Sequence, residues 1–183
     1  MQATTTAEPT AREIATLVHL ATLTHLEAQV RAATTLEELQ FVAVNETRRL
    51  VPYEQAILLS ATDSEDTPYR AVTASSVAVI DRDAPMMVWL EEGVQAVRQA
   101  QPGDAPIVLE QEAIPESLGA GWQEFVHGHV LWCPLKHPDD SILGGLWIER
   151  ESPWQENDVT IVRRLTGSFA YAWKALSTRH IGW

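Results

Sequence analysis

His129-Val-Leu-Trp-Cys-Pro-Leu-Lys begins the stretch of sequence that decides the fold, which continues through the turn His137-Pro-Asp-Asp-Ser to Ile142-Leu-Gly-Gly-Leu-Trp-Ile-Glu. Two extended apolar runs joined by a segment of turn-forming residues predict a β-hairpin. A polar break follows at 151–158, and the sequence after it has the spacing of an amphipathic helix. This hairpin and its closing helix indicate a fold more specifically than any other part of the chain.

The final helix has two adjacent apolar stripes. The first stripe contains Val159, Val162, Thr166, Phe169, Trp173 and Leu176, and the second contains Ile161, Leu165, Ser168, Ala172 and Ala175. Such a helix can cover its own sheet with one stripe and meet a second surface with the other. We expect that second surface to belong to a partner chain, with Ile161, Leu165, Phe169 and Trp173 as the candidate contact residues. A wide core-facing helix in a monomer is the alternative.

Composition limits the class of protein. The chain has 183 residues with 45% apolar content, which fits one domain with a sizeable core. Cys133 is the only cysteine, so no internal disulfide, catalytic thiol pair or cysteine-based zinc site is possible, in agreement with a reducing compartment. The longest uncharged stretch, 14–26, is too short to span a bilayer, and no signal sequence opens the chain. We therefore expect a cytoplasmic location.

Negative charge is concentrated in the middle of the chain. The formal net charge is −12, and residues 63–128 hold 12 acidic side chains against three arginines. A surface of that sign repels phosphate backbones, and no basic patch with interleaved aromatics offsets it. Nucleic acid is therefore excluded as an expected partner, and solvated surface is the simplest interpretation of the acidic segment.

The N-terminal part predicts two helices before the first strand. Residues 1–9 are expected to be flexible. A capping box formed by Thr10 and Glu13 then begins a helix over 10–32, whose apolar face is a candidate dimer surface. That face contains Ile14, Leu17, Val18 and Ala21. Thr34 or Thr35 caps a second helix that Pro52 ends, within a domain expected at 33–177 and followed by a tail at 178–183.

Between these helices and the hairpin, the pattern alternates between strands and helices. Gln55–Ala61 and the segment from Tyr69 to Ser76 predict a first hairpin, and a helix follows from Asp81 to Gln101. Pro106–Leu109 predicts a short strand, and 114–125 a short helix or structured loop. The predicted order is α-α-β-β-α-β-(α)-β-β-α, an α+β fold in one domain.

This order resembles the GAF domain, a small-molecule sensor module, over roughly residues 30–176. The resemblance is carried by Leu36-Glu-Glu-Leu, Asn45-Glu-Thr-Arg-Arg-Leu, Ala56-Ile-Leu-Leu, Val72-Thr-Ala-Ser-Ser, Val130-Leu-Trp-Cys-Pro-Leu, Leu143-Gly-Gly-Leu-Trp-Ile and the final helix. It implies a PAS- and profilin-like antiparallel sheet of five or six strands. The N- and C-terminal helices are expected on one face, and a ligand pocket under the connecting segments on the other.

The resemblance implies regulation by binding. The chain lacks the Asn-Lys-x-Phe-x-x-x-Asp-Glu pattern of cyclic-nucleotide-binding members, and Cys133 falls in a predicted strand instead of beside a roof histidine as in bilin-binding members. Both ligand classes are therefore disfavoured, and no cofactor is expected. A haem-binding sensor remains a less favoured alternative, because His127, His129 and His137 lie close in sequence.

Seven tryptophans favour an aromatic-lined pocket. The ligand-pocket candidates are Ser75, Trp89, Trp122, Phe125, His127, His129 and Cys133. Plain core filling is an equally good interpretation of the tryptophans, and structural or surface roles are the simpler interpretation of the histidines, so no metal site is predicted. Catalysis has little support and is not expected, because Gly-x-Ser-x-Gly, phosphate-loop and His-Glu-x-x-His motifs are all missing.

Two functional classes remain open. The first is a regulatory domain that binds an unidentified small molecule and acts through its terminal helices in a homodimer. The second is a dimerisation or scaffold module of the same fold with an empty pocket. The chain is either a stand-alone protein or a piece of a longer one, and a membrane is expected only through a missing downstream region.

Overall fold

A five-stranded antiparallel sheet forms the centre of the molecule, in a computed structural model that describes residues 7–179. The strand order is β2-β1-β5-β4-β3. The strands are β1 Gln55–Ala61, β2 Tyr69–Ala74, β3 Ile107–Leu109, β4 His129–Lys136 and β5 Ile142–Arg150. The predicted α+β class and antiparallel sheet are confirmed. The expected flexible segment 1–9 and tail 178–183 fall mostly outside the described residues.

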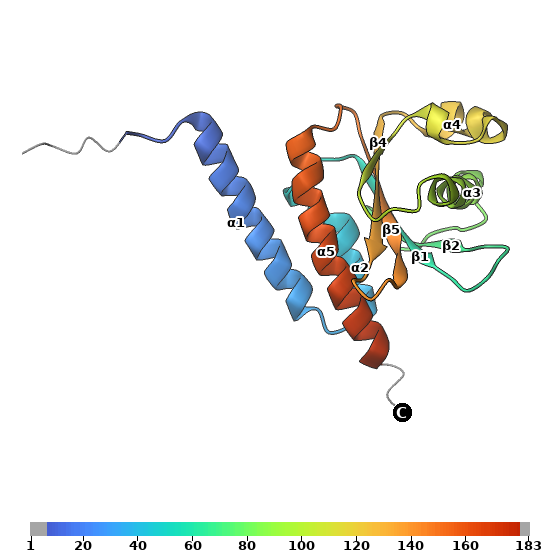
Figure 1. Ribbon diagram of the computed structural model, residues 1–183, viewed down its shortest axis with the longest axis horizontal. Helices are drawn as coiled ribbons and strands as arrows, with labels where there is room; N and C mark the ends of the chain where they lie inside the picture. Colours follow the sequence, from blue (N-terminus) through green and yellow to red (C-terminus); the bar gives the residue numbers. More distant parts are fainter. Residues whose placement is uncertain (1–6, 180–183) are drawn as a thin grey trace, which may run out of the picture.

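Three helical segments lie on one side of the sheet, where the N-terminal one packs outside the C-terminal one (Figure 1). They are α1 Ala11–Ala32, α2 Leu36–Phe41 and α5 Glu156–Arg179. The capping box that begins α1 is present, with the Thr10 hydroxyl accepting from the Glu13 N–H and the Glu13 carboxylate accepting from the Thr10 N–H. The helices and the sheet enclose a core that includes Leu26, Leu58 and Phe169.

The second predicted helix is a regular α-helix only over α2. A π-helical turn at Val42–Glu46 and a 3₁₀ turn at Thr47–Arg49 replace the expected regular helix. The Thr47 hydroxyl donates to the Ala43 carbonyl, and the Tyr53 hydroxyl donates to the Val44 carbonyl. Side chains therefore take carbonyls that an α-helix would pair with backbone N–H groups, which accounts for the irregular turns.

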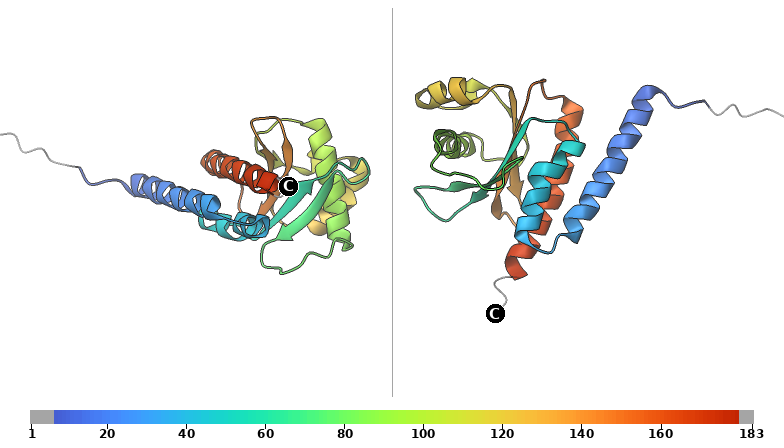
Figure 2. Two further views of the ribbon diagram at one scale, coloured as in Figure 1. Left: turned by 90° about the horizontal axis from the view of Figure 1, so that it is seen from below. Right: turned by 180° about the vertical axis from the view of Figure 1, so that it is seen from behind.

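The opposite face of the sheet is roofed by α3 Pro85–Ala100 and α4 Gly119–Phe125, with short 3₁₀ turns between them and the strands (Figure 2). Pro85 stands in the first turn of α3, where its missing N–H is harmless. A second core lies between this roof and the sheet, separate from the core on the helical face. The protein therefore has the predicted arrangement of terminal helices on one face and connecting segments on the other.

Three of the four α5 residues expected at a dimer surface are buried in the core of their own chain. Leu165 is fully buried, and Phe169 and Trp173 are buried with it in the core beneath α1 and α2. Ile161 is only half-buried. The expectation that all four residues form a dimer surface is therefore wrong for Leu165, Phe169 and Trp173, which pack inside the core of their own chain. Within residues 7–179, no helix is long and apolar enough to cross a membrane.

Candidate functional site

Five aromatic side chains meet between the sheet and its roof, and we call them the roof cluster: Trp89, Trp122, Phe125, Trp132 and Trp147. The ring centroid of Trp89 lies 6.4 Å from that of Trp122 and 6.1 Å from that of Trp147. These pairs are edge-to-face, the arrangement that indole rings favour in a packed core. The cluster occupies the region where the sequence predicts a ligand pocket.

Helices α3 and α4 hold the upper part of the cluster in place. The Trp89 indole N–H donates to the Leu118 carbonyl at 2.9 Å, which ties α3 to the segment that begins α4. Gly121 lies directly against the Trp89 ring, and a Cβ at this position would overlap the ring. The glycine in α4 is therefore required by the close approach of α3.

The lower part of the cluster stands on neighbouring strands. Trp132 on β4 and Trp147 on β5 are directly opposite each other in the antiparallel ladder, so their rings project from the same face. Both side chains are almost fully buried, and neither indole N–H has a hydrogen-bond partner within the described part of the chain. A buried donor without an acceptor is unfavourable, so these two N–H groups are the unusual feature of the site.

Tyr69 and Arg98 border the roof cluster, and both are functional candidates that the sequence did not reveal. Tyr69 packs edge-on against Trp132 with ring centroids 6.1 Å apart. Burial raises the pKa of the Tyr69 hydroxyl, and the neighbouring Arg98 guanidinium opposes that rise. Arg98 is itself buried and donates to the Gly103 carbonyl at 2.7 Å. A lone arginine in a helix gives no sequence signal of this role, because its partners are backbone atoms and a distant strand residue.

The predicted pocket residues separate into two groups. Trp89, Trp122 and Phe125 come together in the roof cluster as predicted. Ser75 does not join them, because its side chain accepts the Ala56 N–H at 2.9 Å and fastens the end of β2 to β1. Cys133 was wrongly expected in the pocket. Its side chain points to the helical face, since β4 alternates and Trp132 takes the roof side.

Burial also defines the chemistry of Cys133. The side chain is fully buried in the core beneath α5, and burial raises the pKa of its thiol far above the ordinary range. A thiol without access to solvent is a small apolar packing group and a poor nucleophile.

The three histidines of the haem alternative do not converge. His129 and His137 lie at the two ends of β4, and His137 contacts Asp139 and the ring of Tyr171. His127 is exposed before β4, where its backbone N–H donates to Glu149. Among residues 7–179, no group of three or more histidine, cysteine, aspartate or glutamate side chains is arranged to hold a metal ion.

The sheet order and the two-sided helical arrangement define the GAF fold. No protein-family model and no curated protein matches the sequence. In structure, the chain is similar to the GAF domain of a phosphoenolpyruvate-protein phosphotransferase from Coxiella burnetii, with a TM-score of 0.60 and 18% identity over 90% of this chain and 98% of that one. It is also similar to the phycoerythrobilin-bound GAF domain of a cyanobacterial phytochrome, with a TM-score of 0.64 and 11% identity over 88% of this chain and 97% of that one.

A third similar structure, the dark state of JSC1_58120g3 with bound biliverdin, has a TM-score of 0.61 and 16% identity over 85% of this chain and 99% of that one. The expectation of no cofactor, with bilins disfavoured, is contradicted by this comparison. GAF domains bound to biliverdin, phycoerythrobilin and phycocyanobilin are among the structures that share this fold. The position of one cysteine is too narrow a basis for excluding a ligand class that the fold accommodates.

Proposed function

We propose that the chain is a non-catalytic regulatory module that acts as a homodimer through α1 and α5. Structures with this fold include a segment of a methyl-accepting chemotaxis protein and a domain of a two-component sensor histidine kinase from Sinorhizobium meliloti, which supports a role in signalling. The observation that carries the dimer is the exposed apolar surface at the start of α1.

The N-terminal half of α1 carries large apolar side chains that residues 7–179 leave exposed. Ile14 is 49% exposed, Leu17 61% and Val18 57%, and Ala21 is exposed beside them. In contrast, Leu23, Leu26 and Val30 in the second half are buried against the domain. A row of exposed apolar side chains on one helix is typical of an interaction surface. These four residues are the dimer candidates that the structure leaves accessible.

A groove beside this surface offers a place for a second copy. The first half of α1 diverges from α5, as two views show (Figures 1 and 2), while the Arg164 guanidinium meets the Glu27 carboxylate at 3.2 Å lower down. The resulting groove has a volume of about 340 Å³. Its lining comprises Thr16, His19, Leu20 and Leu23 of α1 and Asn157, Thr160, Ile161 and Arg164 of α5. The half-buried Ile161 therefore stays a candidate contact.

Two-fold symmetry makes these features complementary. In an isologous dimer the same surface is used by both copies, so the exposed row on α1 of one copy can enter the groove of the other. Four helices then pack as a bundle around a shared apolar centre. Ligand-dependent changes in one domain would reach the partner through α5, which lies on both the sheet and α1.

Sedimentation equilibrium and native mass spectrometry test the dimer. The wild-type chain is expected to be a dimer at micromolar concentration, and the double change Leu17→Glu with Val18→Glu is expected to make it a monomer with an unchanged circular dichroism spectrum. Val79→Glu is the matched control, since Val79 is 83% exposed on a distant loop. A monomeric wild-type chain, or a dimeric double variant, contradicts the proposal.

A second candidate function is binding of a small molecule within the roof cluster. The unpaired indole N–H groups of Trp132 and Trp147 favour it, because a ligand with hydrogen-bond acceptors supplies what both donors lack. The rings themselves fill the space, so binding requires the roof to open. In a thermal-shift screen of aromatic carbonyl compounds, a ligand that raises the melting temperature of the wild type is expected to lose its effect in the variant Trp132→Phe with Trp147→Phe. An equal shift in both proteins contradicts this function.

A further inference from the structure

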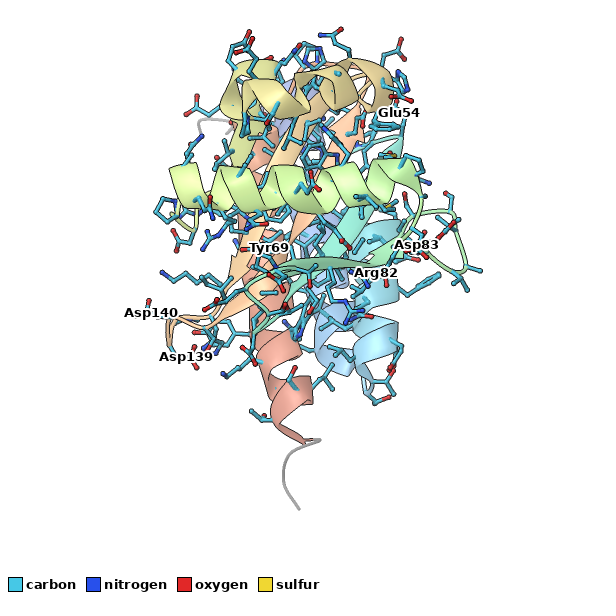
Figure 3. The ribbon with its side chains drawn as sticks, turned by 90° about the vertical axis from the view of Figure 1, so that its right-hand side faces the viewer. Glu54, Tyr69, Arg82, Asp83, Asp139 and Asp140 are labelled. Carbon is cyan, nitrogen blue, oxygen red and sulfur yellow. The ribbon has the colours of Figure 1, made fainter. Side chains whose placement is uncertain are left out.

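Three strand ends enclose an acidic hollow outside the roof cluster and away from α1. Its volume is about 270 Å³. Its lining consists of Glu54 before β1, His127 and Gly128 before β4, and Glu149, Arg150 and Glu151 at the end of β5. Figure 3 labels Glu54 at the end of the molecule where α4 lies. The sequence gives no hint of this group, because its members come from three separate segments.

Backbone contacts bring the three segments together. The Glu54 N–H donates to the Glu149 carbonyl at 3.1 Å, and the Glu151 N–H donates to the Glu54 carboxylate at 2.9 Å. Gly128 lies so close to the Arg150 carbonyl that a Cβ would overlap it. The hollow is therefore built by the packing of strand ends and does not depend on a single loop.

Glu149 is the unusual member of the lining. Its side chain is 6% exposed, and one carboxylate oxygen accepts the His127 N–H at 2.6 Å. The other oxygen is buried and has no hydrogen-bond partner within the described part of the chain. Burying a carboxylate oxygen without a donor is unfavourable, so the structure lacks a donor at this point.

Positive side chains nearby are engaged elsewhere. The Arg150 guanidinium lies over the Trp154 ring and meets the Asp158 carboxylate at 2.7 Å. Arg48 donates to the carbonyls of Tyr53 and Glu54 instead of to a carboxylate. Within residues 7–179, none of Glu54, Glu149 and Glu151 forms an ion pair. Three carboxylates without counter-charge around one concave surface attract cations.

We propose that this hollow binds a small organic polycation, an aliphatic diamine or polyamine, with one ammonium group donating to Glu149 and others meeting Glu54 and Glu151. The carboxylates are not grouped to ligate a metal ion, whereas a flexible chain with several ammonium groups can reach separate carboxylates. The volume lies below the roughly 300 Å³ at which sites for drug-sized molecules begin, which suits a small amine. Because the unpaired oxygen is buried, the lining of the hollow shifts when the amine enters.

Isothermal titration of the full chain with putrescine and spermidine at constant ionic strength tests the proposal. Both amines are expected to bind, spermidine more tightly, while butane-1,4-diol, which lacks the charge, does not. Glu149→Gln is expected to weaken spermidine binding about tenfold or more, because a hydrogen bond between two charged groups is lost. Glu65→Gln is the matched control, since Glu65 is an exposed carboxylate in the β1–β2 turn, at the opposite end of β1 from Glu54, and it leaves binding unchanged.

A second variant, changed only at exposed positions, tests the proposal if the Glu149→Gln protein does not fold. Glu54 and Glu151 are both exposed, so the double change to glutamine preserves the core and is expected to weaken binding severalfold. Absence of amine binding, or equal affinity in wild type and both glutamine variants, overturns the proposal. Tighter binding of Mg²⁺ or Ca²⁺ in competition with spermidine also overturns it, in favour of an inorganic cation. The dimer variant on α1 leaves this site intact, so the two proposals fail separately.

Discussion

The ring of Trp132 occupies the space that a side chain at Gly145 would need. Gly145 lies on β5 beside Trp132 on β4, and a Cβ at Gly145 would overlap the six-membered part of the indole. The adjacent Gly144 has φ 155° and lies against the Leu59 carbonyl of β1. Gly145 therefore makes room for the Trp132 ring, and Gly144 makes room for the backbone of β1. Together they determine how closely the roof cluster packs on the sheet.

Gly145→Ala is expected to destabilise the protein by about 1–3 kcal/mol, because the ring of Trp132 must leave its position in a packed core. Urea unfolding followed by tryptophan fluorescence measures the change. Gly167→Ala is the matched control. Gly167 is exposed on α5 with nothing near its Cβ position, so this change is expected to stabilise the helix by about 0.5–1 kcal/mol. Equal effects of the two changes would contradict the fit of Trp132 over Gly145.

Glu91 on α3 connects the roof to the edge of the sheet. Its carboxylate accepts the Ala71 N–H of β2 at 3.0 Å and meets the Arg82 guanidinium at 3.1 Å. Glu91→Ala is expected to cost about 1–3 kcal/mol, since it leaves a partly buried backbone donor unpaired. Chemical denaturation gives the free energy, and hydrogen exchange at the Ala71 amide should become faster. Glu92→Ala changes an exposed neighbour on the same helix and should alter neither quantity.

Cys133 is expected to resist alkylation in the native protein. Its thiol is fully buried, and burial raises its pKa, so neither access nor thiolate is available. Labelling with iodoacetamide, read by mass spectrometry, should follow global unfolding and become complete only in denaturant. Rapid labelling under native conditions would show that the core beneath α5 opens locally.

The hydrogen bonds of Asp139 lead us to expect that the stability of the protein depends on pH. Hydrogen bonds from the Ser141 hydroxyl and N–H lower the pKa of the Asp139 carboxyl, with smaller contributions from His137 and Lys174. A carboxyl whose pKa is lowered in the folded state stabilises the fold at pH values above its ordinary pKa of 3.8. This contribution is lost as the pH falls through the folded-state pKa. Asp139→Asn should therefore lower the urea midpoint at neutral pH and approach the wild type in acid.

Asp63→Asn is the control for that measurement, because it removes a carboxylate from the exposed β1–β2 turn, away from the hairpin tip. A carbon-detected NMR titration of Asp139 tests the pKa directly. A midpoint at or above the ordinary value would contradict the hydrogen-bonded arrangement at the hairpin tip.

The hairpin at 129–150 shows how much of the structure local sequence patterns can predict. Its two apolar runs, its turn and the helix after it are local patterns, and the structure has them at nearly the predicted residues. The resemblance to the GAF domain also placed Trp89, Trp122 and Phe125 together above the sheet, since each belongs to a segment expected to roof it. Period-two alternation alone could have put Cys133 on either face, and only the position of Trp132 in the assembled core settles that choice.

The sequence by itself determined the elements of this protein, their order and the α+β fold, because turn residues, helix caps and hydrophobic periods act over a few residues. Tertiary structure alone decided what each apolar face meets. It buried Leu165 of the second α5 stripe in the core, left the start of α1 uncovered by residues 7–179, and gathered Glu54, Glu149 and Glu151 around one hollow. Contacts between residues this distant in sequence depend on how whole elements pack, and no local pattern carries that information.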